Sequence, residues 1–256
     1  MGNFPLPNLP SRTSKPRREG LTMIMDKGLG PHAVEDLLTI AAPYIDFVKL
    51  GWTTAYVTGS LESKVRLYKE GGVEPYFGGT LWEALYVRGA TSEFYRLLDR
   101  YQIQVVEVSD GSVEVPHEEK LRWIADFRQR GYVVLSEVGS KDAAKVLPPF
   151  RWIELIQAEL EAGSLWVIAE ARESGTVGMY RSTGEVREGL VEEVVHVIPH
   201  HKLIFEAPQR SQQVWFIRRF GANTNLGNIS PEDILSVETL RLGLRGDTFW
   251  TFIRQE

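Results

Sequence analysis

The sequence predicts an α/β protein built as a single (β/α)8 TIM barrel. Two observations carry this prediction: short apolar runs alternate with helical segments eight times along the chain, and four consecutive runs end in glutamate. Such alternation is typical of a parallel sheet covered by helices. An open, doubly wound sheet is the alternative. It is disfavoured because neither GxGxxG nor GxxxxGK[S/T] follows any predicted strand.

The predicted strands are short apolar runs that end at glycine or at a polar residue. Fully apolar strands are normally buried on both faces, as in the sheet of a barrel. In chain order they span residues 21–25, 45–48, 73–77, 105–109, 134–139, 167–172, 203–208 and 222–226. The fourth to the seventh contain Glu107, Glu137, Glu170 and Glu206.

The segments between these strands place apolar residues three and four positions apart, which is the spacing of one helix face. Residues 31–44, for example, carry Val34, Leu37 and Leu38. The last helix opens with Ser230 and Pro231, a typical cap followed by proline in the first turn. The expected helices span residues 31–44, 60–70, 93–101, 118–130, 150–162, 185–195 and 212–220, and one begins near 231.

The chain length fits one barrel domain, since 256 residues and 29.0 kDa suffice for eight strand–helix units. Residues 1–19 are rich in proline and arginine and are expected to form a flexible N-terminal extension. Residues 20–256 are expected to form the catalytic barrel. We also expect a homo-oligomer, with Trp82, Tyr86 and Tyr95 as exposed aromatic residues at a subunit contact.

Composition argues against several classes of partner. A net charge of −5 gives no electrostatic reason to expect nucleic acid or an anionic membrane. No apolar run approaches the roughly 20 residues of a membrane-spanning helix. The chain contains no cysteine, and its first residues lack the apolar core of a signal peptide. A cytoplasmic location is therefore expected.

The glutamates at the strand ends indicate an active site, because barrel enzymes place theirs at the C-terminal ends of the strands. Carboxylates in an apolar setting are costly unless a cation or a hydrogen-bonding group accompanies them. A divalent cation meets that need, and oxygen ligands suit Mg²⁺ or Mn²⁺ better than zinc. Alternatively, the glutamates pair with Lys49, Lys141 or Arg172 only to organise the mouth of the barrel.

Lysines at the strand ends are candidate acid–base groups, because burial and nearby cations lower a lysine pKa. Lys27 and Lys49 follow apolar strands directly, and Lys141 lies in the loop after the strand of Glu137. The loops after the seventh and eighth strands are common phosphate sites in barrels. Together the strand ends favour a phosphorylated or otherwise anionic substrate, and the candidate binding residues are Asp26, Ser109, Arg172, Glu206, Gln209, Arg210 and Asn228.

The strand ends carry a series of short motifs in a fixed order. They include Asp26-Lys27-Gly28, Lys49-Leu50-Gly51-Trp52, Gly78-Gly79-Thr80, Glu107-Val108-Ser109-Asp110, Glu137-Val138-Gly139, Arg172-Glu173-Ser174-Gly175 and Phe205-Glu206-Ala207-Pro208-Gln209. These motifs resemble the phosphosulfolactate synthase family, and the resemblance extends from about Arg18 to Phe249. The chain departs from the family pattern at Thr53 and Ala171, where glycine is usual, and at Gly227, where alanine is usual.

The resemblance implies a Mg²⁺-dependent lyase that adds sulfite to C3 of phosphoenolpyruvate and forms (2R)-phospho-3-sulfolactate, a step towards coenzyme M in methanogens. It further implies that Glu107, Glu137 and Glu170 hold Mg²⁺, which stabilises an aci-carboxylate. Lys141, or otherwise Lys49, then protonates C2. Glu206 is expected to have a different role. A relative that acts on another phospho-acid, or a non-catalytic homologue associated with stress, remains the alternative.

Overall fold

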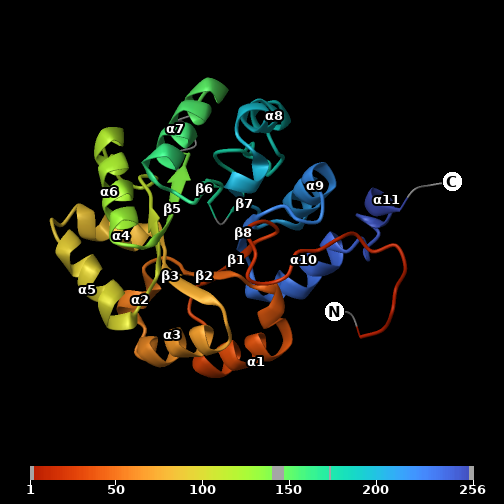
Figure 1. The fold of residues 1–256 in the computed structure, drawn as a ribbon, viewed down its shortest axis with the longest axis horizontal. Coiled ribbons are helices and arrows are strands. Elements are labelled where there is room, and N and C mark those ends of the chain that lie inside the picture. The colour runs from red at the N-terminus through yellow and green to blue at the C-terminus, as the bar shows by residue number, and fades with distance from the viewer. Residues whose placement is uncertain (1–2, 140–146, 173, 254–256) are drawn as a thin grey trace.

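The computed structural model describes residues 3–139, 147–172 and 174–253 and confirms the (β/α)8 barrel. Its eight strands run parallel in one sheet, in the order β3-β2-β1-β8-β7-β6-β5-β4. The two strands at the ends of this order, β3 and β4, are neighbours, so the barrel is nearly closed. Helices surround the strands on the outside (Figure 1).

The strands lie close to the predicted positions, with one exception. Their bounds are β1 Thr22–Asp26, β2 Phe47–Leu50, β3 Glu74–Phe77, β4 Val105–Val108, β5 Val133–Val138, β6 Trp166–Ala169, β7 Leu203–Glu206 and β8 Leu226–Ile229. The prediction of the eighth strand at residues 222–226 was wrong, because β8 begins where that strand was expected to end. The side chain of Asn225 instead bonds Leu21 N, His201 O and Leu203 O, and such side-chain bonds compete with a regular ladder.

The helices also follow the prediction, apart from three that the periodicity missed: α2, α4 and α11. Two of these have four residues, and α4 begins at a glycine pair, which is a poor helix signal. The helices are α1 Pro31–Ala41, α2 Thr54–Val57, α3 Leu61–Glu70, α4 Gly79–Tyr86, α5 Thr91–Tyr101, α6 His117–Gln129, α7 Pro149–Ala162, α8 Glu188–Val197, α9 Arg210–Phe220, α10 Ile234–Arg241 and α11 Phe249–Phe252. Ser230 makes no capping bond, because its hydroxyl contacts Glu232 and a short 3-10 turn, Pro231–Asp233, precedes α10.

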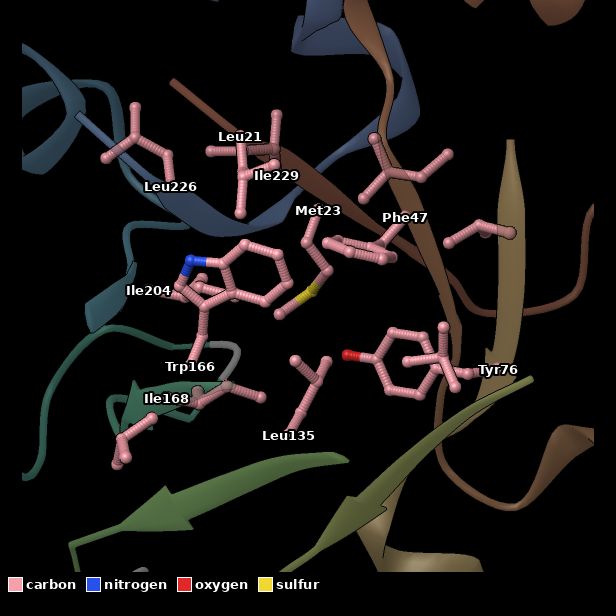
Figure 2. Close-up of a cluster of buried hydrophobic side chains, with 14 of the residues drawn as sticks. Leu21, Met23, Phe47, Tyr76, Leu135, Trp166, Ile168, Ile204, Leu226 and Ile229 are labelled. Atoms are coloured by element: carbon pink, nitrogen blue, oxygen red, sulfur yellow. The ribbon is translucent and has the colours of Figure 1, made fainter. Parts of the chain in front are cut away.

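The interior of the barrel is apolar, and the side chains that fill it come from strands around its circumference (Figure 2). Phe47 of β2 and Trp166 of β6 meet edge to face, with ring centroids 5.9 Å apart. Alternate residues of a strand share one face. Ile204 therefore precedes Glu206 on the same face of β7, and Leu135 precedes Glu137 on β5. The glutamates thus form the next layer towards the C-terminal ends of the strands.

Residues 3–21 contain no helix or strand, yet this N-terminal segment contacts the barrel. Arg12 pairs with Glu238 at 3.0 Å and Arg17 pairs with Asp46 at 3.2 Å. The carbonyl of Arg18 accepts a hydrogen bond from the indole of Trp166. We call residues 12–18 the arm. The described part of the expected flexible extension therefore includes an arm that packs on the N-terminal end of the barrel.

The expectation that Trp82 is exposed was wrong, since only 1% of its surface is accessible. Its ring stacks on Tyr86, with centroids 5.2 Å apart, and meets Trp123 edge to face. Tyr86 and Tyr95 are half-buried in the same aromatic group. Among the described residues, no helix is long and apolar enough to cross a membrane.

Candidate active site

A cavity of about 750 Å³ opens at the C-terminal ends of the strands, where the sequence places the active site. This size is typical of a site for a small-molecule ligand. Residues from six strands, and from the segments that follow β2, β3, β4 and β6, form its walls. They are Met25, Lys49, Gly51, Trp52, Gly78, Gly79, Thr80, Glu107, Gly111, Ser112, Glu137, Glu170, Arg172, Glu206 and Asn228.

Lys49 lies at the centre of this site and is 4% exposed. Its Nζ is 3.1 Å from Glu107, 3.2 Å from Glu206 and 3.8 Å from Glu137. Burial alone lowers the pKa of Lys49, but the surrounding negative charges outweigh it and raise that pKa well above its ordinary value. Lys49 is therefore held as an ammonium ion and is a poor proton donor.

Glu107 is fully engaged by neighbouring protein groups. Its Oε1 accepts a hydrogen bond of 2.7 Å from Gly79 N, at the start of α4, and its Oε2 accepts one of 2.9 Å from the Tyr76 hydroxyl. Lys49 completes this set of partners. The carboxylate therefore joins β3, β4 and α4 at one wall of the cavity.

A different set of glutamates forms the candidate metal site: Glu137, Glu170 and Glu206 each offer an oxygen atom, and these atoms lie within 4.8 Å of one another. The structure thus groups Glu206, in place of Glu107, with the other two expected ligands. All three residues are buried. Burial raises the pKa of Glu206, although Lys49 and the backbone N–H of Ala171 act in the opposite direction.

The charges of this cluster favour a divalent cation. Three buried carboxylates lie within 3.8 Å of the ammonium of Lys49, and Arg172 is exposed at the rim of the cavity. Buried carboxylates repel one another unless a cation offsets their charge. Carboxylate oxygens are the ligands that Mg²⁺ prefers. The donor set therefore fits a metal ion of this type.

Other expected site residues line the cavity or its rim, and one cannot be placed. Arg172 and Asn228 line the cavity. Lys27 is exposed, with its Nζ 4.9 Å from the centre of the Trp52 ring at the cavity wall. Lys141 lies outside the described residues.

Two expected substrate-binding residues are fully buried and do not line the cavity. Asp26 pairs with Lys64 at 3.0 Å and accepts hydrogen bonds from the Tyr68 hydroxyl and from two backbone N–H groups after β1. Ser109 donates its hydroxyl hydrogen to Glu83 of α4. Both side chains hold their strand ends in place from behind the cavity wall.

The two expected phosphate-binding residues after β7 also have partners within the protein. Gln209 caps α9 through reciprocal bonds with Gln212, and its Nε2 donates to the carbonyl of Ser174 at 2.6 Å. Arg210 is exposed and pairs with Asp247 at 2.5 Å. Neither residue is among those that line the cavity.

Sequence reasoning missed Glu83, which shapes one wall of the cavity. Its carboxylate accepts hydrogen bonds from the backbone N–H groups of Gly111 and Ser112, both at 3.1 Å, and from the hydroxyl of Ser109. Gly111 and Ser112 line the cavity. The signal was absent because Glu83 lies on α4, a helix that the periodicity did not reveal.

Comparison with known proteins identifies the family. The family model described as (2R)-phospho-3-sulfolactate synthase (ComA) matches residues 10–247. A phosphosulfolactate synthase from Methanothermobacter thermautotrophicus is 43% identical over 244 residues, which cover 93% of this chain and 95% of that protein. The phosphosulfolactate synthase of Bacillus subtilis is 43% identical over 253 residues, which cover 98% of this chain and 100% of that protein.

More distant comparisons agree with the fold. The Arabidopsis thaliana protein HEAT-STRESS-ASSOCIATED 32 is 24% identical over 264 residues, or 90% of this chain and 88% of that protein. The solved structure of 3-hexulose-6-phosphate synthase from Salmonella typhimurium is 12% identical, has a TM-score of 0.57 and covers 88% of this chain and 100% of that chain. At this identity the structural likeness concerns the fold alone. The family match and the two relatives at 43% identity instead establish descent, and the chain belongs to the (2R)-phospho-3-sulfolactate synthase family.

Proposed function

We propose that this protein is a Mg²⁺-dependent phosphosulfolactate synthase that adds sulfite to C3 of phosphoenolpyruvate. Family membership supports the reaction. The observation that carries the metal requirement is the convergence of Glu137, Glu170 and Glu206 within 4.8 Å at the wall of the cavity. Under this proposal the small-molecule substrates enter from the C-terminal face of the barrel.

In the proposed reaction, the sulfur of sulfite forms a bond to C3 of phosphoenolpyruvate. The π electrons of the C2–C3 bond move towards the substrate carboxylate, and a proton is then added at C2. Mg²⁺, held by Glu137, Glu170 and Glu206, would stabilise the negative charge that builds on that carboxylate. Sulfite is already a nucleophile near neutral pH, so no residue is required to activate it.

The protein's own groups set the conditions for this chemistry. Lys49 orients Glu107 and Glu206, because its ammonium contacts both carboxylates. The raised pKa of Lys49 makes it a poor source of the C2 proton. We therefore assign that proton to Lys141, as the family resemblance implies. Arg172 at the rim favours the approach of an anionic substrate.

The test is the sulfite-dependent consumption of phosphoenolpyruvate by the purified protein. We expect phosphoenolpyruvate to disappear and phosphosulfolactate to form only when sulfite and Mg²⁺ are both present. A parallel reaction with EDTA, and one without sulfite, serve as controls. Full recovery of phosphoenolpyruvate from the complete mixture, with the protein folded, would reject the proposal. A screen of other phospho-acids would then follow.

A further inference from the structure

Asn228 has a buried side chain whose amide oxygen has no hydrogen-bond partner among the described residues. It lies at the C-terminal end of β8, is 5% exposed and lines the cavity. Its Oδ1 has no hydrogen-bond partner within residues 3–139, 147–172 and 174–253. A buried amide that makes no hydrogen bond costs free energy. A bound ligand would remove that cost.

The backbone at this position carries a second cost. Asn228 has a φ of +52°, in the left-handed region that most residues other than glycine avoid. The register between β1 and β8 shifts here, because Thr22 pairs with Leu226 but Ile24 pairs with Ile229. Two residues of β8 thus oppose one residue of β1, which is a β-bulge. Bulges near active sites commonly redirect a side chain, and this one directs Asn228 to the cavity.

The neighbours of Asn228 indicate what it binds. Gly227, the residue before it, pairs with Glu206 of the candidate metal site across β7 and β8. The carboxylates of that site repel an anionic substrate. An amide nitrogen can donate a hydrogen bond to an anionic oxygen without adding charge. Oδ1 itself only accepts, but rotation of the amide by half a turn exchanges its oxygen and nitrogen and places the donor where Oδ1 lies.

We propose that the side-chain amide of Asn228 donates a hydrogen bond to an anionic oxygen of the bound phospho-acid and so fixes its position beside the metal site. This inference rests on the proposed function for the identity of the substrate. It makes Asn228 a substrate-binding residue whose unfavourable backbone and unused amide are retained for that contact.

The test compares Asn228→Gly with a matched change at the other end of the same strand. Asn225 is also buried, but its side chain bonds Leu21, His201 and Leu203. We expect Asn228→Gly to unfold at the same temperature as the wild type or a higher one. Its KM for phosphoenolpyruvate should rise about tenfold with little change in kcat. Asn225→Gly should lower the unfolding temperature and leave KM unchanged.

Asn228→Asp sharpens the test, because the shape is kept while the donor is replaced by a negative charge. Its KM for phosphoenolpyruvate should exceed that of Asn228→Gly. A calorimetric titration then shows which group of the substrate accepts the bond from Asn228. The Mg²⁺-loaded wild type and Asn228→Gly are each titrated with inorganic phosphate and with oxalate. Weaker phosphate binding by the variant assigns the contact to the phosphate group, and weaker oxalate binding assigns it to the carboxylate.

The inference is overturned if Asn228→Gly binds phosphoenolpyruvate, phosphate and oxalate as tightly as the wild type does. It is also overturned if the variant loses stability to the same degree as Asn225→Gly. A wild type that binds phosphoenolpyruvate without adding sulfite to it, and whose binding weakens in Asn228→Gly, would reject the proposed function and leave this inference standing.

Discussion

The two ends of the barrel use buried charge in opposite ways. At the N-terminal end, Arg241 is 0% exposed and its guanidinium donates to the carbonyls of Ala222, Thr224 and Leu21. At the C-terminal end, Glu137, Glu170 and Glu206 converge around a cavity. The guanidinium at the first end is bonded to backbone carbonyls inside the fold, whereas the carboxylates at the second end line a cavity and offer oxygen atoms that could hold a metal ion.

The arm explains much of this difference. Arg12 forms an ion pair with Glu238, and Arg17 forms one with Asp46. The ammonium group of Lys15 contacts the carbonyls of Ala42, Ile45 and Gly72. Chain segments therefore cover the N-terminal end, and its charges stabilise the fold. At the open end, charged side chains of the same types line the cavity.

The largest expected effect is at the open end. Glu170→Gln keeps the acceptor for the backbone N–H of Arg172 but removes one negative charge from the candidate metal site. We expect activity to fall on the order of 10²–10³-fold, as when one electrostatic partner of a transition state is removed. Steady-state kinetics measure this loss, and thermal unfolding without Mg²⁺ verifies that the variant is folded.

At the closed end, Arg241→Met should lower stability and leave specific activity intact. The change removes the guanidinium N–H groups that donate to the carbonyls of Ala222 and Thr224. These buried carbonyls then lose a hydrogen-bond donor. We expect a loss of about 3 kcal/mol in the free energy of unfolding, measured by urea denaturation. Arg219→Met, at an exposed ion pair with Glu192, is the control and should be close to neutral. Lost specific activity in folded Arg241→Met would contradict the division between the two ends.

The arm gives a smaller effect of the same kind. Arg12→Ala removes the ion pair with Glu238 and a hydrogen bond to Asn223. Because both partners of the pair are largely buried, we expect a loss of about 2 kcal/mol in the free energy of unfolding. Arg66→Ala, which breaks an exposed pair with Glu70 at 3.9 Å, should change stability far less. Equal effects from the two variants would show that the arm does not stabilise the barrel.

The smallest effect concerns pH. Burial raises the pKa of Asp46, while Arg17 opposes the shift only in part. The folded state therefore binds the proton of Asp46 more tightly than the unfolded state, whose pKa is about 3.9. The stability that this proton contributes is present below that value and is lost as pH rises through the pKa of the folded state. Relative to Asp46→Asn, the wild type should lose stability over this range in urea titrations. If the difference in the free energy of unfolding between the two proteins does not change with pH, the raised pKa of Asp46 is not its cause.

The sequence was sufficient to predict the barrel and several of the strand-end residues that line the cavity, because strand ends follow directly from apolar runs. Lys49 and the four glutamates all line the cavity, as their positions at the ends of strands implied. The roles of Glu107 and Glu206 could not be separated in this way. Gly79 N and the Tyr76 hydroxyl engage Glu107 across two other elements, and only the folded chain brings them together.

Two further features depend on contacts between distant residues. The arm is held by pairs such as Arg12 with Glu238, and no local pattern connects these positions. The bulge at Asn228 arises from the pairing of β8 with β1, at the opposite end of the chain. Hydrophobic periodicity carries no information about either feature, so the sequence predicted a flexible extension and a strand displaced from its true position.

The most direct test of the contrast between the two ends of the barrel is to measure the unfolding temperature of the protein as Mg²⁺ is added. A ligand that binds only the folded state raises this temperature. We predict a rise for the wild type and for Arg241→Met, and none for Glu170→Gln. If Mg²⁺ leaves the wild type unchanged, or raises Glu170→Gln by the same amount, then the carboxylates at the open end do not form a metal site.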